Sequence, residues 1–265
     1  MKKTAAIWLS ILLGLSLAGC SGNASAESVY KKAAESWSKK DAVEMNLTMN
    51  ASVSQDGGAA QNGMTGVLKE TGRNSEEGKE RTILVEASMN LDMGTGSPMT
   101  IPISYAYAGG KLYVDMAGSR YQQSVTDAQL SAQVFHGLDL FSKLEAKEYR
   151  NMEIAEENGS YRITFGIGAE DVKKIAGSIP QIQEYRDTYG EGLTMNFADA
   201  EGTFEINEDH VPQKTTFRLK VDLSAEGLSA SLVYDITEEY VNFGDKVTLT
   251  LPDFSGYEEV KVPEA

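Results

Sequence analysis

The feature that most constrains the fold is an alternation of apolar and polar residues that recurs along most of the chain. Every second side chain from residue 45 to residue 53 is apolar, namely Met45, Leu47, Met49, Ala51 and Val53. A strand has this period of two when one face meets a core and the other meets water. The alternation returns in segments 64–71, 82–92, 101–107, 112–116, 121–125, 148–156, 161–167, 193–198, 202–207, 213–223, 228–238 and 246–251. We therefore predict many antiparallel strands that share one apolar face.

Turn residues separate these segments. A turn-rich loop is expected from Asp56 to Gly63, and Ala108-Gly109-Gly110-Lys111 predicts a tight hairpin, because glycine accepts the positive φ that such turns need. Most neighbouring segments are therefore expected to pair as hairpins.

Three segments have helical periodicity instead. Residues 27–40 place apolar side chains at spacings of three and four, which predicts an amphipathic helix. Thr126 and Gln129 fit a capping box with Val125 and Leu130 around it, so a second helix should begin there. A third helical segment covers residues 169–189, with a break at Pro180.

These elements predict the fold class. About ten antiparallel strands with few helices to cover their apolar face indicate an α+β protein. A sheet that wide should curl, because flat sheets of about ten strands are unusual. We expect a strongly curved antiparallel sheet, an open half β-barrel of about ten strands, wrapped around a few helices.

The N-terminus has the pattern of an export signal. Lys2 and Lys3 precede an apolar run from Ala5 to Ala18, which is too short for a comfortable membrane span. The following Leu17-Ala18-Gly19-Cys20 resembles a bacterial lipobox, which implies that Cys20 receives a diacylglyceryl group and becomes the first residue after cleavage. The alternative is an ordinary cleaved signal that contains a cysteine. We expect a signal peptide at 1–19, a lipidated linker at 20–26 and a single domain at 27–265.

Charge and cysteine content limit the partners. The formal net charge is −15, and Cys20 is the only cysteine, which excludes a disulfide framework and a cluster of thiolate metal ligands. Nucleic acid and anionic lipid surfaces attract chains with a Lys and Arg surplus, so we predict neither as a direct partner. The membrane contact is expected through lipid at Cys20, on the extracytoplasmic face of the cell membrane.

Several stretches together resemble a known family. They are the lipobox, the amphipathic first helix, the hairpin Tyr105–Asp115 and the closing run from Gly202–Ile206 to Val247–Pro252. In pattern and element order, over nearly the whole mature chain, they look like uncharacterised Gram-positive lipoproteins, which are similar in turn to the LolA/LppX-like lipoprotein-carrier superfamily. The resemblance implies a half-barrel whose apolar interior binds acyl chains or other lipids.

The ligand cavity that this resemblance implies would be lined by the apolar face of the strands. The expected lining residues are Met45, Leu47, Met49, Val85, Met89, Tyr105, Phe217, Leu219, Val221, Leu232 and Tyr234. Methionine suits variable acyl chains because it is flexible and polarizable, yet it also fills ordinary cores. The alternative is therefore a filled core, in a cell-surface protein-interaction or scaffold module that has no ligand.

The sequence offers little for catalysis. His136 and His210 are the only histidines, and neither has a neighbouring Cys, His or helix-spaced carboxylate to complete a site. The acidic pairs Glu156-Glu157, Glu238-Glu239 and Glu258-Glu259 are expected at the solvated surface. We therefore predict no enzyme, no catalytic residue, no metal site and no cofactor.

Overall fold

The computed structural model describes residues 25–260, except 56–57, 75–80, 92–98, 127–128, 131–136, 178, 180–181, 183–185, 187, 189 and 226–227. Cys20, His136 and Pro180, with the expectations attached to them, lie outside the described residues. The described helices are α1 (Ala26–Ser38), α3 (Leu140–Lys143) and α4 (Ala169–Ala176), with short 3-10 helices η2 (Ala146–Glu148), η3 (Gly190–Gly192) and η4 (Gly244–Lys246). Among the residues described, no helix is both long and apolar enough to cross a membrane.

The described strands all belong to one sheet. They are β1 (Val43–Gln55), β2 (Gly58–Thr71), β3 (Thr82–Leu91), β4 (Met99–Ala108), β5 (Lys111–Met116), β6 (Ser119–Ser124), β7 (Tyr149–Glu157), β8 (Ser160–Ile167), β9 (Thr194–Phe197), β10 (Ala200–Ile206), β11 (Pro212–Ala225), β12 (Leu228–Phe243) and β13 (Glu258–Glu259). Their order is β13-β6-β5-β4-β3-β2-β1-β12-β11-β10-β8-β7, and β9 pairs with β11. Only the short β13–β6 pairing is parallel among them.

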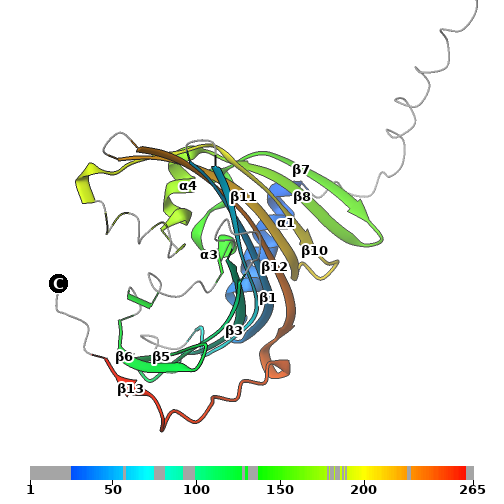
Figure 1. Ribbon diagram of the computed structural model, residues 1–265. Helices are drawn as coiled ribbons and strands as arrows, with labels where there is room; N and C mark the ends of the chain where they lie inside the picture. The colour runs from blue at the N-terminus through cyan, green and yellow to red at the C-terminus, as the bar shows by residue number, and fades with distance from the viewer. Residues whose placement is uncertain are drawn as a thin grey trace, which may run out of the picture.

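The sheet curls into an open half-barrel, with β5 and β6 at one end of the arc and β7 and β8 at the other (Figure 1). Helices α3 and α4 lie inside the arc (Figure 1). The α+β half-barrel, which the family resemblance also implied, is therefore confirmed. The expected glycine hairpin joins β4 to β5, with Gly109 at φ +58° and Gly110 at φ +76°.

The concave face of the sheet, here called the inner face, carries the core. One continuous cluster of buried apolar side chains runs from β1 and β2 through β12 and β11 to β8. Helix α1 adds Val29, Ala33 and Trp37 to it. Tyr30 of α1 joins it as well, and its hydroxyl donates to the carbonyl of Leu144 at 2.7 Å. The amphipathic first helix thus packs on the same face that the strands bury.

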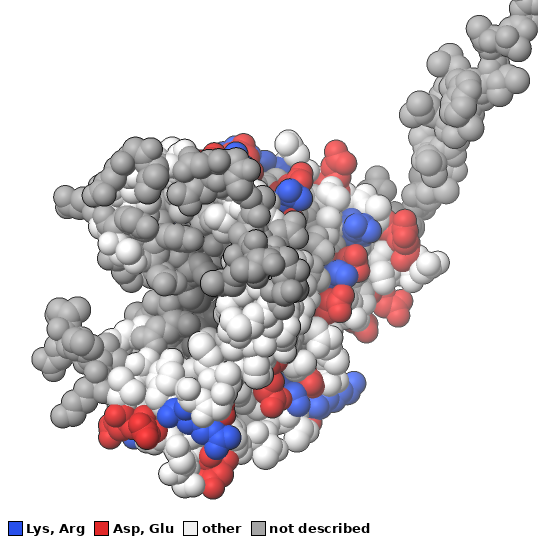
Figure 2. Space-filling model, in the orientation of Figure 1, with Lys and Arg blue, Asp and Glu red and all other residues white. Residues whose placement is uncertain are grey.

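The outer face is charged and solvated. Cross-strand ion pairs join Lys214 to Glu239 at 2.8 Å and Arg218 to Asp235 at 3.3 Å. On the face drawn in Figure 2, basic and acidic side chains are interspersed rather than gathered into patches of one sign. Each strand therefore separates an apolar interior from a mixed-charge exterior.

The predicted capping box is present. The backbone N–H of Thr126 donates to Oε1 of Gln129 at 2.8 Å, and the backbone N–H of Gln129 donates to Oγ1 of Thr126 at 3.3 Å. Val125 and Leu130 beside it are buried. Residues 129–130 are helical, and the backbone N–H of Leu130 donates to the carbonyl of Thr126 at 2.8 Å, so a helix begins here as predicted.

Two of the predictions for strands and loops are wrong. Residues 58–63, expected in a loop, belong to β2, because β1 and β2 stay paired down to Gln55 opposite Gly58. Residues 246–251 were expected to form a strand, but η4 ends at Lys246 and residues 247–251 are not in a strand. The neighbouring β12 already pairs with β1 and β11, so it has no edge left for this segment.

The segment after β12 instead crosses to the far edge of the sheet. The ring of Phe254 stacks on Tyr113 of β5 with centroids 3.7 Å apart, and Arg120 of β6 lies over the ring of Tyr257. Strand β13 then pairs with β6, and the backbone N–H of Val260 donates to the carbonyl of Gln122 at 2.9 Å. We call residues 244–260 the C-terminal strap, and its last residues, 258–260, cover the β6 edge.

Candidate functional site

The residues expected to line a cavity all share the inner face. Register places Met49 opposite Met64 of β2, which in turn lies opposite Met89 of β3. On the other side, Met49 lies opposite Ile236, and Ile236 lies opposite Phe217. Met89 and Tyr105 are half-buried. The other nine, namely Met45, Leu47, Met49, Val85, Phe217, Leu219, Val221, Leu232 and Tyr234, are buried in the core.

Burial of the inner face decreases toward one end of the strands. This far end is where β1 and β3 finish and β4 begins. Ile103 is buried there, but most of its inner-face neighbours are only half-buried, namely Ala51, Val53, Ala87, Met89, Leu91 and Ile101. Met99 and Met116 are 49% and 38% exposed. Apolar surface therefore continues beyond the packed core and remains accessible.

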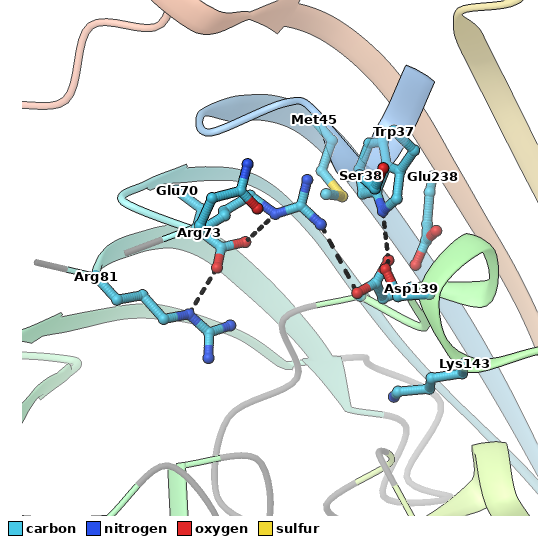
Figure 3. Close-up of a pocket in the computed structure, with 12 residues that line it drawn as sticks. Trp37, Ser38, Met45, Glu70, Arg73, Arg81, Asp139, Lys143 and Glu238 are labelled. Carbon is cyan, nitrogen blue, oxygen red and sulfur yellow. Dashed lines mark hydrogen bonds and ion pairs between the residues drawn. The ribbon is translucent and has the colours of Figure 1, made fainter. Parts of the chain in front are cut away.

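The opposite end of the strands is polar. A pocket of about 360 Å³ opens where α1 ends and β1 begins (Figure 3). Its lining consists of Trp37, Ser38, Met45, Glu70, Arg73, Asn74, Arg81, Gly137, Asp139, Ser142, Lys143 and Glu238. We call it the polar pocket. Of the residues predicted to line a ligand cavity, only Met45 belongs to it.

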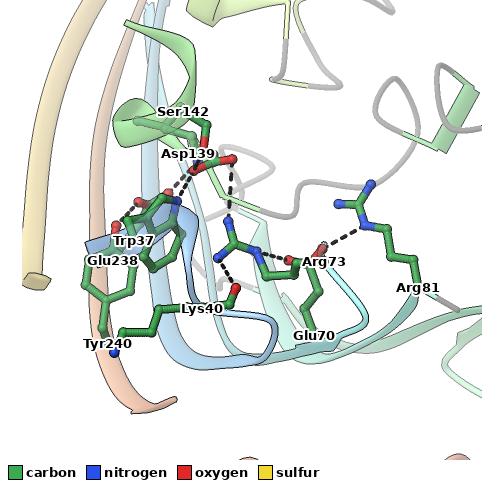
Figure 4. A network of polar contacts seen from close by, with 10 residues as sticks. Trp37, Lys40, Glu70, Arg73, Arg81, Asp139, Ser142, Glu238 and Tyr240 are labelled. Carbon is green, nitrogen blue, oxygen red and sulfur yellow. Dashed lines mark hydrogen bonds and ion pairs between the residues drawn. The ribbon is translucent and has the colours of Figure 1, made fainter. Parts of the chain in front are cut away.

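Arg73 joins the walls of the polar pocket (Figure 4). Its guanidinium carbon lies 4.1 Å from the centroid of the Trp37 ring, a cation–π geometry. Its Nη1 donates to the carbonyl of Lys40 at 3.3 Å, its Nε lies 3.4 Å from Glu70 and its Nη2 lies 3.7 Å from Asp139. Arg73 thus ties helix α1, strand β2 and the start of α3 together.

The two carboxylates at this junction have further partners. Glu70 accepts a hydrogen bond from Nε of Arg81 at 2.7 Å. Asp139 accepts from Nε1 of Trp37 at 2.6 Å and from the hydroxyl of Ser142 at 3.0 Å. Both acids are therefore neutralised by protein groups, which holds the pocket walls in place.

Glu238 was expected at the solvated surface, and that expectation is wrong. Its side chain lies on the inner face of β12 and is 1% exposed. It accepts hydrogen bonds from the backbone N–H of Leu138 and from the hydroxyl of Tyr240. Burial raises the pKa of Glu238, because the charged form loses its hydration.

Sequence reasoning missed the polar pocket, although one signal was present. Glu70 and Glu238 keep the period of the buried residues, since they follow Leu68 and Ile236 by two positions. A carboxylate in phase with an apolar face indicates a buried polar site. Arg73, Arg81 and Asp139 lie in connections and carry no such periodicity.

His210 does not line the polar pocket. His210 lies in the turn before β11, where its Nδ1 is 3.0 Å from the carbonyl of Glu208 and its ring is 5.5 Å from that of Tyr161. Its Nε2 is buried and has no hydrogen-bond partner among the described residues. In the described part of the chain, no group of three His, Cys, Asp or Glu side chains is arranged to hold a metal ion.

Comparison with known proteins gives similarity only in solved structures, since no family model and no curated protein matches the chain. LprF from Mycobacterium bovis is 13% identical over 87% of this chain and 97% of its own, with a TM-score of 0.45. YwiB from Bacillus subtilis is 10% identical over 78% and 99%, with a TM-score of 0.25. A DUF1329 family protein from Desulfovibrio piger ATCC 29098 is 10% identical over 85% and 95%, with a TM-score of 0.22. The function has to be argued from the residues of this chain.

Proposed function

We propose that this chain is a membrane-anchored, extracytoplasmic lipoprotein that binds a lipid or other hydrophobic ligand on the inner face of the half-barrel. The observation that carries the proposal is the accessible apolar surface at the far end, which continues the packed core. Exposed apolar area costs about 25 cal/mol per Å². An acyl chain laid over Met89 and its neighbours would remove this cost.

The inner face also suits a ligand of variable shape. Met49, Met64 and Met89 lie side by side across β1, β2 and β3, and Met45 lies on the same face of β1, opposite Leu68. Methionine side chains adapt to irregular apolar partners because they are unbranched and polarizable. This favours binding of flexible chains over recognition of one rigid molecule.

The expected anchor would keep the half-barrel beside a membrane. Cys20 precedes Ser25, the N-cap of α1, by five residues, so the fully extended tether spans roughly 17 Å. Two acyl chains on Cys20 satisfy the two-signal condition for stable anchoring. A lipid leaving the membrane would therefore have a short path to the inner face.

The proposal can be tested with the chain that begins at Ser21, which retains every described helix and strand. A fluorescent fatty acid should bind it and be displaced by dodecanoic acid. Met89→Asp should weaken binding at least about tenfold, because a charge would then face the apolar ligand. Asn90→Asp is the matched control, since Asn90 is exposed on the opposite face of β3.

Two results would contradict the proposal. One is a wild-type chain that binds no fatty acid and carries no lipid after extraction and mass spectrometry. The other is equal binding loss in Met89→Asp and Asn90→Asp. The first result would favour the alternative, a scaffold or protein-interaction module with a filled core.

A further inference from the structure

Two tyrosines lie beside the accessible apolar surface at the far end. Tyr105 of β4 and Tyr121 of β6 lie on either side of Val114 of β5, each directly opposite it. Val114 is buried on the inner face, and directly opposite residues share a face, so both tyrosines face inward. Strands β5 and β6 form one end of the arc (Figure 1), and both side chains are half-buried there. We call Tyr105 and Tyr121 the tyrosine pair.

In the part of the chain that the structure describes, neither hydroxyl of the tyrosine pair makes a hydrogen bond. Removal from water raises the pKa of Tyr105, and the charge of an ionised Tyr121 would raise it further. Tyr105 therefore keeps its proton, and a protonated phenol can donate a hydrogen bond to an acceptor oxygen. A ligand oxygen beside the pair would replace the hydration that partial burial removes.

The inner face around the tyrosine pair carries no formal charge. Its positions on β4, β5 and β6, all of them described, are every second residue from Met99 to Tyr107, from Leu112 to Met116 and from Ser119 to Gln123. None of these is Asp, Glu, Lys or Arg. An ionised ligand group would lose hydration there with no opposite charge beside it, and the net charge of −15 repels anions. The surroundings therefore favour an uncharged acceptor, such as an ester carbonyl.

Accessible apolar side chains connect the tyrosine pair to the far end. Met116 is 38% exposed and lies two positions beyond Val114, diagonal to both tyrosines and within reach of their rings. Ile103 is buried, but Met116 lies opposite it, and the next inner-face residue of β4, Ile101, is half-buried opposite Met89. The surface from the pair through Met116 to Ile101 and Met89 thus stays outside the packed core.

We propose that the tyrosine pair donates hydrogen bonds to the ester oxygens of an uncharged acylated lipid, whose acyl chain lies over Met116, Ile101 and Met89. The inference rests on the proposed function and names its ligand class. It also assigns the two hydroxyls a role in binding that is separate from the apolar contact made by their rings.

The test uses three probes and the chain that begins at Ser21. Diphenylhexatriene is a fluorescent hydrocarbon without oxygen, so its binding reports the apolar surface alone. Monododecanoyl glycerol and dodecanoate then compete with it, both kept below the concentration at which they aggregate and at a mildly alkaline pH that ionises dodecanoate. We expect monododecanoyl glycerol to bind at least about threefold more tightly than dodecanoate.

Tyr105→Phe and Tyr121→Phe each remove one hydroxyl and keep the ring. Each change should weaken the binding of monododecanoyl glycerol about threefold to tenfold, because one hydrogen bond is lost. The affinity for diphenylhexatriene should stay the same in both variants. Tyr113→Phe is the matched control, because the Tyr113 ring stacks on Phe254 of the strap and lies outside the inner face. It should leave both affinities unchanged.

Three results would overturn the tyrosine site while the proposed function stands. They are a monododecanoyl glycerol affinity that survives both Tyr105→Phe and Tyr121→Phe, an equal loss in Tyr113→Phe, and dodecanoate binding as tightly as the ester. A parallel loss of diphenylhexatriene affinity in Tyr105→Phe or Tyr121→Phe would also overturn it, because the hydroxyl would then act through the apolar surface. A wild-type chain that binds none of the three probes would overturn both proposals.

Discussion

At the scale of single residues, the inner face combines apolar packing with a few costly polar groups. Glu238 and Glu70 are buried side chains, 1% and 5% exposed, and each is stabilised by specific donors at the polar pocket. Buried acids of this kind persist only when protein groups replace water. Their replacement should therefore reveal what each one contributes.

The first prediction concerns pH. An acid whose pKa is raised by folding contributes its full stabilisation below its usual pKa, here 4.5. This stabilisation is lost as the pH rises through the pKa of the folded state. Glu238→Gln is neutral at every pH. Its unfolding free energy relative to wild type should therefore rise from pH 4.5 toward neutrality, as measured by urea unfolding at several pH values.

Glu239→Gln serves as the control, because the neighbouring Glu239 is exposed and paired with Lys214. It should show no such rise. A pH-independent difference between Glu238→Gln and wild type would contradict the prediction.

The second prediction concerns Gly66, where strands approach too closely for a side chain. A Cβ at Gly66 would lie 2.6 Å from both Cβ of Ala87 and the carbonyl oxygen of Glu86. Gly66→Ala should therefore cost about 1–3 kcal/mol of unfolding free energy, because strand β3 must shift. Chemical denaturation measures this.

Gly63→Ala on the same strand provides the comparison. A Cβ there would meet the side-chain oxygen of Asn50 at 3.1 Å, and a side chain can move more easily than a backbone. Its cost should stay below about 1 kcal/mol. Equal costs at the two glycines would show that contact with β3 is not the cause.

At the scale of elements, the period of each segment predicted most strands and α1, because side-chain alternation is a local property. The extension of β2 through residues 58–63 was missed. It follows from pairing with β1, which overrides the turn-forming residues of that stretch. The strap was missed for a related reason: the alternation of residues 246–251 predicts a strand, but only the completed sheet decides whether an edge remains for it.

The polar pocket could not be predicted as a site, because its residues come together only when the elements pack. Arg73 and Asp139 lie far apart in the chain and meet only when α1, β2 and α3 pack together. By contrast, the shared face of Met45, Leu47 and Met49 was readable from alternation alone. The alternation does not predict which end of that face is buried in the core and which end stays accessible.

The third prediction tests how the strap is attached. The stacked pair of Phe254 and Tyr113 should be worth about 0.5–1.5 kcal/mol beyond area burial. Phe254→Ala should therefore speed amide hydrogen exchange in β6 and β13, with less effect on β1 and β12. Val260→Ala, at a side chain 47% exposed, should leave exchange nearly unchanged. Uniform acceleration over the whole sheet would contradict local release of the strap.

At the scale of the whole molecule, one sheet serves two environments. Its outer face carries mixed charges, and its inner face carries the core, the accessible apolar end and the polar pocket. All described elements follow residue 24, so attachment at Cys20 would leave the fold itself unchanged. Location and ligand binding should therefore be separable by mutation.

The fourth prediction tests the anchor. In bacterial cells, the full chain should partition with membranes, because each buried CH₂ of an acyl chain contributes roughly 0.8 kcal/mol. Cys20→Ser should move it to the aqueous phase of a detergent-partition assay, whereas Ser21→Ala should not. An unchanged distribution of Cys20→Ser would contradict lipidation at this residue.

The two edges of the sheet affect whether anchored copies of this protein can pair with one another through their strands. Unpaired strand margins are templates for strand exchange between molecules. At one margin the strap occupies β6. At the other, β7 has an irregular register between Arg150 and Glu153, with Glu156 and Glu157 exposed nearby. Proteins tethered to one surface meet at high local concentration in a shared orientation, so blocked and charged margins would let many half-barrels crowd together without polymerising.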